Sequence, residues 1–258
     1  MKSASHVGVH LAKKLLRNRV VKTPVLESRI LNELLGGGRL FIKAENLQHT
    51  GSFKYRGALH RLLILQQDDP EAAARGVVAF SSGNFGQALA AAATTLNIKC
   101  TIISPHDAPP VKLERIKKYG AKLITSIANY NIGENREMIA ATLAKDISVK
   151  NGFTLLHPFD DIDVIHGQGT IGLEFIEQVE DILSNENNGH GNNNGNGNGN
   201  DKESDSKLKM ETIICPAGGG GMAAGICLAS QSIKHKDFLK VMTIEPTGYD
   251  DHEKSFYN

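Results

Sequence analysis

The 258-residue sequence contains no tryptophan, few aromatic residues (5%) and three cysteines. Cys100, Cys215 and Cys227 have no paired spacing and no Cys-x-x-Cys motif, so we expect free thiols in a reducing compartment rather than a disulfide framework. The chain also lacks the run of about eighteen apolar residues that a membrane helix would need. Its first five residues contain no apolar signal segment. These absences predict a cytoplasmic protein that does not use a membrane as a partner.

The chain also has almost no excess charge, because 29 Lys and Arg residues face 28 Asp and Glu residues. A net charge of +1 provides no electrostatic basis for a nucleic acid or an anionic membrane as the main partner. Glycine, by contrast, is abundant at 26 residues. The length is sufficient for one large domain or two modest ones with a substantial core.

Short apolar runs alternate with helical patterns along most of the chain. The expected strands are 39–43, 77–80, 100–104, 121–125, 153–156, 212–215 and 239–244, and the expected helices are 7–16, 28–35, 52–66, 88–96, 111–119, 134–149, 169–182 and 221–233. This alternation predicts an α/β fold in which a parallel, twisted sheet is covered by helices on both faces. A ligand is then expected at the carboxyl ends of the strands.

One segment departs from this alternation. Residues 184–207 are composed mainly of Asn, Gly, Asp, Glu and Ser. Such a composition cannot bury enough apolar surface to offset the entropy of ordering the chain. We therefore predict a disordered surface insert between a helix and a strand, and we assign it no function.

Residues 45–58 run from a strand through a polar turn into a helix, and Lys54 lies at the start of that helix. The positive end of the helix dipole and the nearby Arg56 both favour loss of the lysine proton. A neutral amine is a nucleophile that forms an imine with a carbonyl compound. The alternative is an ordinary solvated lysine on a helix surface, so the remaining chain must supply the partners of a reactive lysine.

A loop with the features of an anion site, 81–87, follows the strand 77–80. Its small residues and the start of the next helix offer backbone N–H groups to a bound anion. Asn84 is suited to a hydrogen bond with a phenolic oxygen, and Ser82 to proton transfer. The alternative interpretation is a turn whose serines cap the helix.

A run of four glycines, 218–221, lies between a later strand and helix. Ordering four glycines costs much chain entropy, which disfavours a purely structural role and favours a backbone that wraps closely around a phosphate. The sequence also satisfies the dinucleotide fingerprint, since Gly218-x-Gly220-x-x-Ala223 precedes Glu245 at the end of the next strand. That alternative leaves Lys54 and the loop 81–87 without a role.

An acidic loop follows the last expected strand. Glu245 and Asp251 are separated by backbone carbonyls, and these oxygens would suit a hard cation such as Mg²⁺ or Ca²⁺. A solvated acidic turn is the alternative. Residues 157–161 also contain a histidine and carboxylates, but without metal-ligand spacing, and we interpret them as a turn.

Four motifs, at 50–58, 81–88, 167–170 and 218–221, together resemble the fold-type II pyridoxal-phosphate enzymes. Within that family, the chain is most similar to the serine racemases and the serine/threonine dehydratases. The resemblance runs from about residue 23 to residue 251 and is interrupted by the insert. It implies a large cofactor domain formed by 1–50 and 158–258, and a smaller domain, 51–157, inserted between them.

The resemblance also implies a role for each candidate residue. Lys54 would bind pyridoxal 5′-phosphate as a Schiff base, Asn84 would bond the ring hydroxyl, and Gly218, Gly219, Gly220 and Gly221 would hold the phosphate. Lys54 and Ser82 would be the catalytic residues, moving protons on opposite faces of the substrate. Ser81, Ser82, Gly83, Asn84 and Gln87 would receive the substrate carboxylate. Glu245, Asp251 and the carbonyl of Tyr249 would bind Mg²⁺, Mn²⁺ or Ca²⁺.

The function implied is racemisation of serine, accompanied by loss of the β-hydroxyl to give a keto acid and ammonia from serine or threonine. A homodimer is implied as well. Two features depart from the family pattern. Phe85 replaces a usual histidine, and relatives continue well past the equivalent of Asn258, so we expect the C-terminal part of the fold to be missing. A threonine/serine dehydratase proper, a non-catalytic truncated paralogue and a nucleotide-dependent oxidoreductase therefore remain as alternatives.

Overall fold

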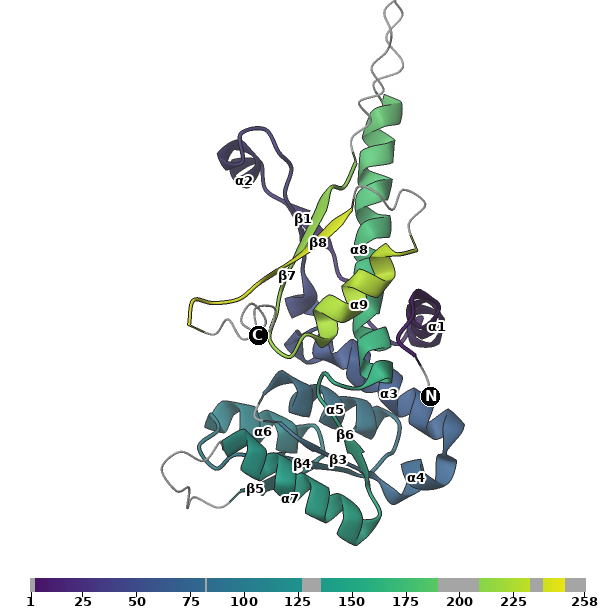
Figure 1. Cartoon of the computed structure of the whole chain (residues 1–258), viewed down its shortest axis with the longest axis vertical. Helices are drawn as coiled ribbons and strands as arrows, with labels where there is room; N and C mark the ends of the chain where they lie inside the picture. The colour runs from purple at the N-terminus through teal and green to yellow at the C-terminus, as the bar shows by residue number, and fades with distance from the viewer. Residues whose placement is uncertain (1–2, 82, 127–135, 190–208, 233–238, 249–258) are drawn as a thin grey trace, which may run out of the picture.

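The computed structural model describes residues 3–81, 83–126, 136–189, 209–232 and 239–248. Ser82, Tyr249, Asp251 and most of the predicted insert lie outside these ranges. In Figure 1 a four-stranded sheet and its helices form the lower half of the molecule. The long helix α8, Ile162–Gly189, extends from there into the upper half, where two smaller sheets lie.

The four-stranded sheet is entirely parallel, with the strand order β5-β4-β3-β6. Its strands are β3 (Val77–Phe80), β4 (Cys100–Ser104), β5 (Lys122–Thr125) and β6 (Thr154–Leu156). The helices around it are α4 (Pro70–Arg75), α5 (Asn84–Thr95), α6 (Pro110–Lys118) and α7 (Arg136–Asn151). The predicted alternation of strand and helix is confirmed in this half of the molecule.

Alternate side chains of β3 explain why this sheet is covered on both faces. Val77 and Ala79 belong to the main core together with the alanines of α5, whereas Val78 packs with Ala140 of α7 on the opposite face. Successive residues of a strand point to opposite faces. A strand that is apolar at every position therefore fits only a sheet with helices on both sides.

The upper half contains two pairs of strands. β7 (Thr212–Pro216) and β8 (Lys240–Ile244) are parallel and are connected through α9 (Gly221–Ser230). β1 (Val25–Glu27) and β2 (Phe41–Lys43) are antiparallel, so they are an exception to the parallel pattern. The remaining elements are α1 (His6–Leu16), α2 (Arg29–Leu34), the short 3-10 helices η1 (Glu45–Leu47) and η2 (His49–Gly51), and α3 (Lys54–Asp68).

Helix α8 is longer at both ends than the sequence pattern predicted. It begins at Ile162 rather than at residue 169, because the Asp161 carboxylate accepts hydrogen bonds from the free amides of Asp163 and Val164. It also continues to Gly189, so the prediction that disorder starts at residue 184 was wrong. The missed start has a plain cause, since Asp161 was interpreted as part of a turn rather than as a helix cap.

Small residues allow α8 to pack closely against its neighbours. A Cβ atom added to Gly225 of α9 would lie 2.5 Å from the backbone nitrogen of Gly169, and one added to Gly167 would lie 2.7 Å from Cα of Gly57 in α3. The glycines of the motif 167–170 therefore have a packing role. They bring α3 and α9 against the same helix.

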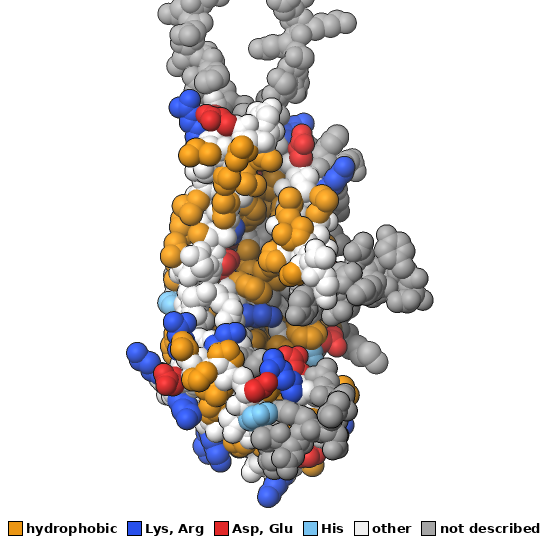
Figure 2. Space-filling view, turned by 90° about the vertical axis from the view of Figure 1, so that its left-hand side faces the viewer, with side chains coloured by type: hydrophobic (Ala, Val, Ile, Leu, Met, Phe, Trp, Pro, Cys, Tyr) orange, Lys and Arg blue, Asp and Glu red, His pale blue; other side chains and the backbone are white. Residues whose placement is uncertain are grey.

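One face of the strands in the upper half is apolar and exposed. Ile213 and Cys215 of β7 point into a core with α8 and α9, whereas Ile214, Met242 and Ile244 are exposed on the other face. Figure 2 shows hydrophobic side chains gathered in a hollow on this side of the molecule. Within the described ranges, no helix is both long and apolar enough to span a bilayer.

Because α8 and α9 cross closely at Gly225, we expect alanine at this position to destabilise the fold. Gly225→Ala should lower the free energy of unfolding by about 1–3 kcal/mol, because overpacking outweighs the gain in helix propensity. Urea denaturation would measure the change. Ala224→Leu, one residue earlier at an exposed position, is the control and should change the free energy by no more than about 0.5 kcal/mol. Equal stability of Gly225→Ala and the unmodified chain would contradict the packing role.

Candidate functional site

Lys54 is the first residue of α3, and its side chain is turned toward the four-stranded sheet. Its Nζ donates a hydrogen bond to the carbonyl oxygen of Pro158 at 3.1 Å. No carboxylate pairs with this amine among the interactions of the described residues. Burial lowers the pKa of Lys54 from 10.5 to about 8. About a tenth of the amine is therefore neutral at pH 7, far more than for an ordinary lysine, and the neutral form is the nucleophile.

The cause of this lowered pKa differs from the one we predicted. Arg56 was expected to act as a neighbouring cation, but its guanidinium is 1% exposed and bonds Glu45 and Glu174. These carboxylates neutralise its charge. Removal of Lys54 from water is the effect that lowers its pKa. Arg56 instead anchors the first turn of α3 between η1 and α8.

A cavity of about 300 Å³ lies beside Lys54. It is found at the carboxyl ends of β3, β4 and β6, where the sequence predicted a ligand. Its walls combine the amine, an amide, a carboxylate and several aromatic rings. The lining residues are Lys54, Phe80, Ser81, Gly83, Asn84, Phe85, Pro105, Glu137, Ala140, Pro158 and Phe159.

The loop after β3 contributes three of the predicted residues to this cavity, namely Ser81, Gly83 and Asn84. The hydroxyl oxygen of Ser81 accepts hydrogen bonds from the amides of Gly83 at 3.2 Å and Gly86 at 3.0 Å. This capping starts α5 at Asn84, four residues before the predicted start. Ser81 thus bonds an amide of the first helical turn, as in the alternative interpretation, while the N-cap residue itself is Gly83.

Phe85 and Gln87 point away from solvent on the first turn of α5. Phe85 is buried in the main core and also lines the cavity, so the position that usually holds histidine contributes an apolar wall. Gln87 is buried but does not line the cavity, and its Oε1 has no hydrogen-bond partner among the described residues.

The glycine run lies where β7 leads into α9. Gly220 adopts a φ of 74° as the cap residue, and α9 begins at Gly221. A Cβ added to Gly219 would collide with the ring of Phe159, and one added to Gly221 would lie 2.8 Å from the Phe159 carbonyl oxygen. Gly218 has open space on its Cβ side. Close approach to Phe159 therefore accounts for Gly219 and Gly221, but it does not account for Gly218.

Sequence reasoning missed the residues that connect these parts. Pro158 accepts the hydrogen bond of Lys54, and Phe159 contacts the glycine run and lines the cavity. They belong to the segment 157–161, which we interpreted as a turn. Its position directly after β6 was the signal that was overlooked, because loops after parallel strands gather at the ligand-binding edge. Glu137 of α7, which also lines the cavity, carried no such signal.

The described residues contain only part of the predicted metal site. Glu245 follows β8 and is half-buried, whereas Tyr249 and Asp251 lie outside the described ranges. Within those ranges, no group of three or more His, Cys, Asp or Glu residues is arranged to hold a metal ion. The metal site stays a prediction.

Comparison with known proteins identifies the family of the chain. The sequence profile of a family described as "Pyridoxal-phosphate dependent enzyme" matches residues 16–258. The chain belongs to this family. Membership favours the phosphate of pyridoxal phosphate over a dinucleotide as the ligand of the glycine run, and it agrees with an α/β fold built on parallel strands.

Among its relatives, serine racemase of Dictyostelium discoideum is 39% identical over 244 residues, covering 95% of this chain and 63% of that protein. L-threo-3-hydroxyaspartate ammonia-lyase of Saccharomyces cerevisiae is 36% identical over 242 residues, covering 93% of this chain and 61% of that protein. The structure of maize serine racemase superposes with a TM-score of 0.79 at 32% identity, covering 98% of this chain and 65% of that one. The chain thus spans less than two thirds of the length of these relatives.

The residues of the site fit the family's cofactor in three respects. A lysine with a pKa of about 8 can react with an aldehyde. Asn84 lies in the same cavity and offers an amide to a ring oxygen. The start of α9 presents backbone amides of residues that carry no side chains of their own, which suits a phosphate. The segment 158–159 touches both Lys54 and the glycine run, so these parts lie around one region.

Because desolvation lowers the pKa of Lys54, we expect this side chain to reduce the free energy of unfolding. The folded-state pKa of Lys54 lies below its unfolded value of 10.5, so folding is penalised wherever the unfolded lysine is protonated. The penalty is complete below about pH 8 and fades as the pH rises toward 10.5. Lys54→Met should therefore be more stable than the unmodified chain by about 2 kcal/mol near neutral pH, with a smaller gain at about pH 9.5.

Urea denaturation at the two pH values measures this difference. Lys118→Met is the control, since Lys118 is exposed on α6. Its effect on the free energy of unfolding should not change with pH. A loss of stability in Lys54→Met that is the same at both pH values would show that the amine is not penalised by burial.

Proposed function

We propose that the chain is the cofactor-binding part of a pyridoxal-phosphate-dependent serine racemase that also acts as a serine/threonine dehydratase. The observation that carries this proposal is the half-buried Lys54 amine, which lines a cavity with Asn84 at the carboxyl ends of three strands. Two relatives, from Dictyostelium discoideum and Arabidopsis thaliana, are named as serine racemases. Others are named as ammonia-lyases or threonine dehydratases.

Pyridoxal phosphate, when bound, supplies an aldehyde that combines with amines and a ring that withdraws electrons from the Cα atom of an amino acid. Lys54 provides the nucleophilic nitrogen and, once released by the substrate, a base for the Cα proton on one face. Ser82 is proposed to move the proton on the other face. Proton return to the opposite face inverts the configuration at Cα. Departure of the β-hydroxyl as water would instead leave an enamine, whose imine form is hydrolysed by water to a keto acid and ammonia.

The remaining residues bind and orient. The amides of residues 218–221 at the start of α9 hold the phosphate, and Asn84 bonds the ring hydroxyl. The substrate carboxylate is received by the loop 81–87, in which Asn84 lies at the mouth of α5. Phe85 and Phe159 provide apolar walls that keep water from the reacting carbon.

Two alternatives remain within this family. A threonine/serine dehydratase proper uses the same residues and differs in the fate of the Cα proton. A non-catalytic paralogue would bind the cofactor without turnover. A nucleotide-dependent oxidoreductase is disfavoured, because the family match covers nearly the whole chain.

Covalent trapping tests the proposal. The chain is purified with pyridoxal phosphate, its visible absorption is recorded, and borohydride is added before peptide mass analysis. We expect an absorption band that borohydride removes, with the cofactor mass found on Lys54. Lys54→Ala should lose both signals, whereas Lys118→Ala, the exposed control, should retain them. Trapping at another lysine, or none at all, would overturn the assignment of Lys54.

Turnover distinguishes the remaining hypotheses. With L-serine as substrate, formation of D-serine supports the racemase, and keto acid without D-serine supports the dehydratase. Trapping on Lys54 without either product supports the non-catalytic paralogue. Binding of NAD(P)H without trapping would instead favour the oxidoreductase.

A divalent cation is proposed at the loop after β8, with Glu245, Asp251 and the carbonyl of Tyr249 as oxygen ligands. If this is correct, millimolar Mg²⁺ or Ca²⁺ will raise the thermal midpoint, and Glu245→Gln will abolish the rise. Glu211→Gln, an exposed carboxylate just before β7, is the control and should preserve it. An equal response of both variants would mean that the cation does not use Glu245. A homodimer and a cytoplasmic location stay predictions from the resemblance and the composition.

A further inference from the structure

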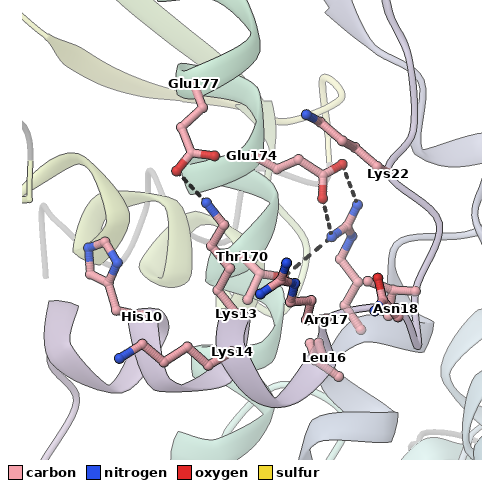
Figure 3. Close-up of a pocket in the computed structure, with 12 residues that line it drawn as sticks. His10, Lys13, Lys14, Leu16, Arg17, Asn18, Lys22, Thr170, Glu174 and Glu177 are labelled. Atoms are coloured by element: carbon pink, nitrogen blue, oxygen red, sulfur yellow. Dashed lines mark hydrogen bonds and ion pairs between the residues drawn. The ribbon is translucent and has the colours of Figure 1, made fainter.

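A second cavity is lined in part by Arg56, which lies two residues after Lys54 on α3. Its volume is about 710 Å³, and Figure 3 shows it between α1, the chain that follows α1, and α8. It shares no lining residue with the cavity beside Lys54. The residues around it are His10, Lys13, Lys14, Leu16, Arg17, Asn18, Val20, Lys22, Arg56, Thr170, Glu174 and Glu177.

The lining of this cavity is strongly unbalanced in charge. Lys13, Lys14, Arg17, Lys22 and Arg56 contribute five positive charges, and Glu174 and Glu177 contribute two negative ones, which leaves an excess of three. The whole chain has a net charge of only +1. A local excess larger than that of the entire protein raises the local concentration of anions.

Both acids of the cavity already have cationic partners. Glu177 pairs with Lys13, and Glu174 bonds Arg56 and also Lys43, which comes from β2. No ion pair within the described ranges involves Lys14, Arg17 or Lys22. These three side chains are exposed. They are therefore available to an anion without the loss of an existing ion pair.

The local fold explains how these cations come to surround one space. Lys14 and Arg17 lie three residues apart at the end of α1, so they project from the same side of the helix. Asn18 adopts a left-handed φ of 61° and turns the chain after the helix. That turn leads Lys22 back to the rim of the same cavity. Favourable interaction with the helix dipole accounts for basic residues at the end of α1, but it does not account for Lys22 or for the hollow.

The size and the polar groups of the cavity favour a small ligand with more than one phosphate. Ligand cavities commonly measure about 300–1,000 Å³, and this one lies within that range. Lysine provides point charges and arginine a two-pronged donor, a combination suited to adjacent phosphate groups. Leu16 and Val20 add a limited apolar surface. A neutral ligand would leave the excess positive charge uncompensated.

We propose that the cavity between α1 and α8 binds a small anion of the diphosphate or bisphosphate class through Lys14, Arg17 and Lys22. This site is separate from the proposed function and does not require it. Inorganic pyrophosphate and an organic bisphosphate share the same recognition chemistry. The experiment therefore uses both as probes.

The test is isothermal titration of the full chain in the presence of saturating pyridoxal phosphate, so that the glycine run 218–221 is not open to the probes, at constant ionic strength. Inorganic pyrophosphate and fructose 1,6-bisphosphate are titrated separately. Sulfate, which has a single anionic group, serves for comparison. We expect saturable binding at one site per chain, with sulfate weaker than at least one of the two probes by about tenfold or more. The tighter of the two probes indicates whether the ligand is inorganic or organic.

A matched pair of variants tests the location. The triple variant Lys14→Gln, Arg17→Gln, Lys22→Gln should weaken binding by about tenfold or more. Arg115→Gln, Lys117→Gln, Lys118→Gln removes two lysines and one arginine from the basic end of α6, which does not border the cavity. This control should bind the probes as the unmodified chain does. Circular dichroism and the thermal midpoint verify that both variants fold.

Three results would overturn the proposal. They are absence of saturable binding, equal affinity for sulfate and both probes, and equal weakening in the cavity variant and the α6 variant. The last result would mean that the anion responds to overall charge rather than to this cavity. Because all six substituted side chains are exposed, unfolding is not expected to obscure the comparison.

Discussion

The buried guanidinium of Arg56 holds together the parts of the molecule on which the site depends. It bonds Glu45 from η1 and Glu174 from α8, and it sits two residues after Lys54 on α3. Although burial alone would raise it, the pKa of Glu174 is lowered by hydrogen bonds from Arg56. Removing one partner of such a buried pair costs about 3–5 kcal/mol. The first turn of α3 is therefore fixed relative to α8, and the position of Lys54 is fixed with it.

The residues around Arg56 border one cavity, and Lys54 of the same helix borders another of different character. Lys54 is partly withdrawn from water beside a cavity with aromatic and polar walls, so its amine loses its proton more readily than an ordinary lysine does. The cations of α1 and the following turn remain exposed around a larger hollow. The protein has almost no net charge overall. It nevertheless contains one lysine with a lowered pKa, Lys54, and one concentrated positive surface. The first suits covalent chemistry, and the second suits reversible binding of anions.

Much of the fold could be predicted because each βα unit carries its own local pattern. Strands such as 77–80 were located correctly, since only a sheet covered on both faces accepts an uninterrupted apolar run. Boundaries governed by a single capping side chain were missed. Ser81 starts α5 early and Asp161 starts α8 early, each through hydrogen bonds from backbone amides. A cap acts at one residue and leaves no periodic signal.

The sequence by itself determined the family, the reactive lysine as a candidate, and the order of the motifs, because these follow from residue types at fixed spacings. Only the tertiary structure decided which effect lowers the pKa of Lys54, since burial depends on what packs around the amine. It also decided that Pro158 and Phe159 belong to the site and that Lys22 joins the cations of α1. These residues are far apart in the chain or carry no distinctive chemistry. Their proximity arises from the packing of strands and helices, which no local pattern records.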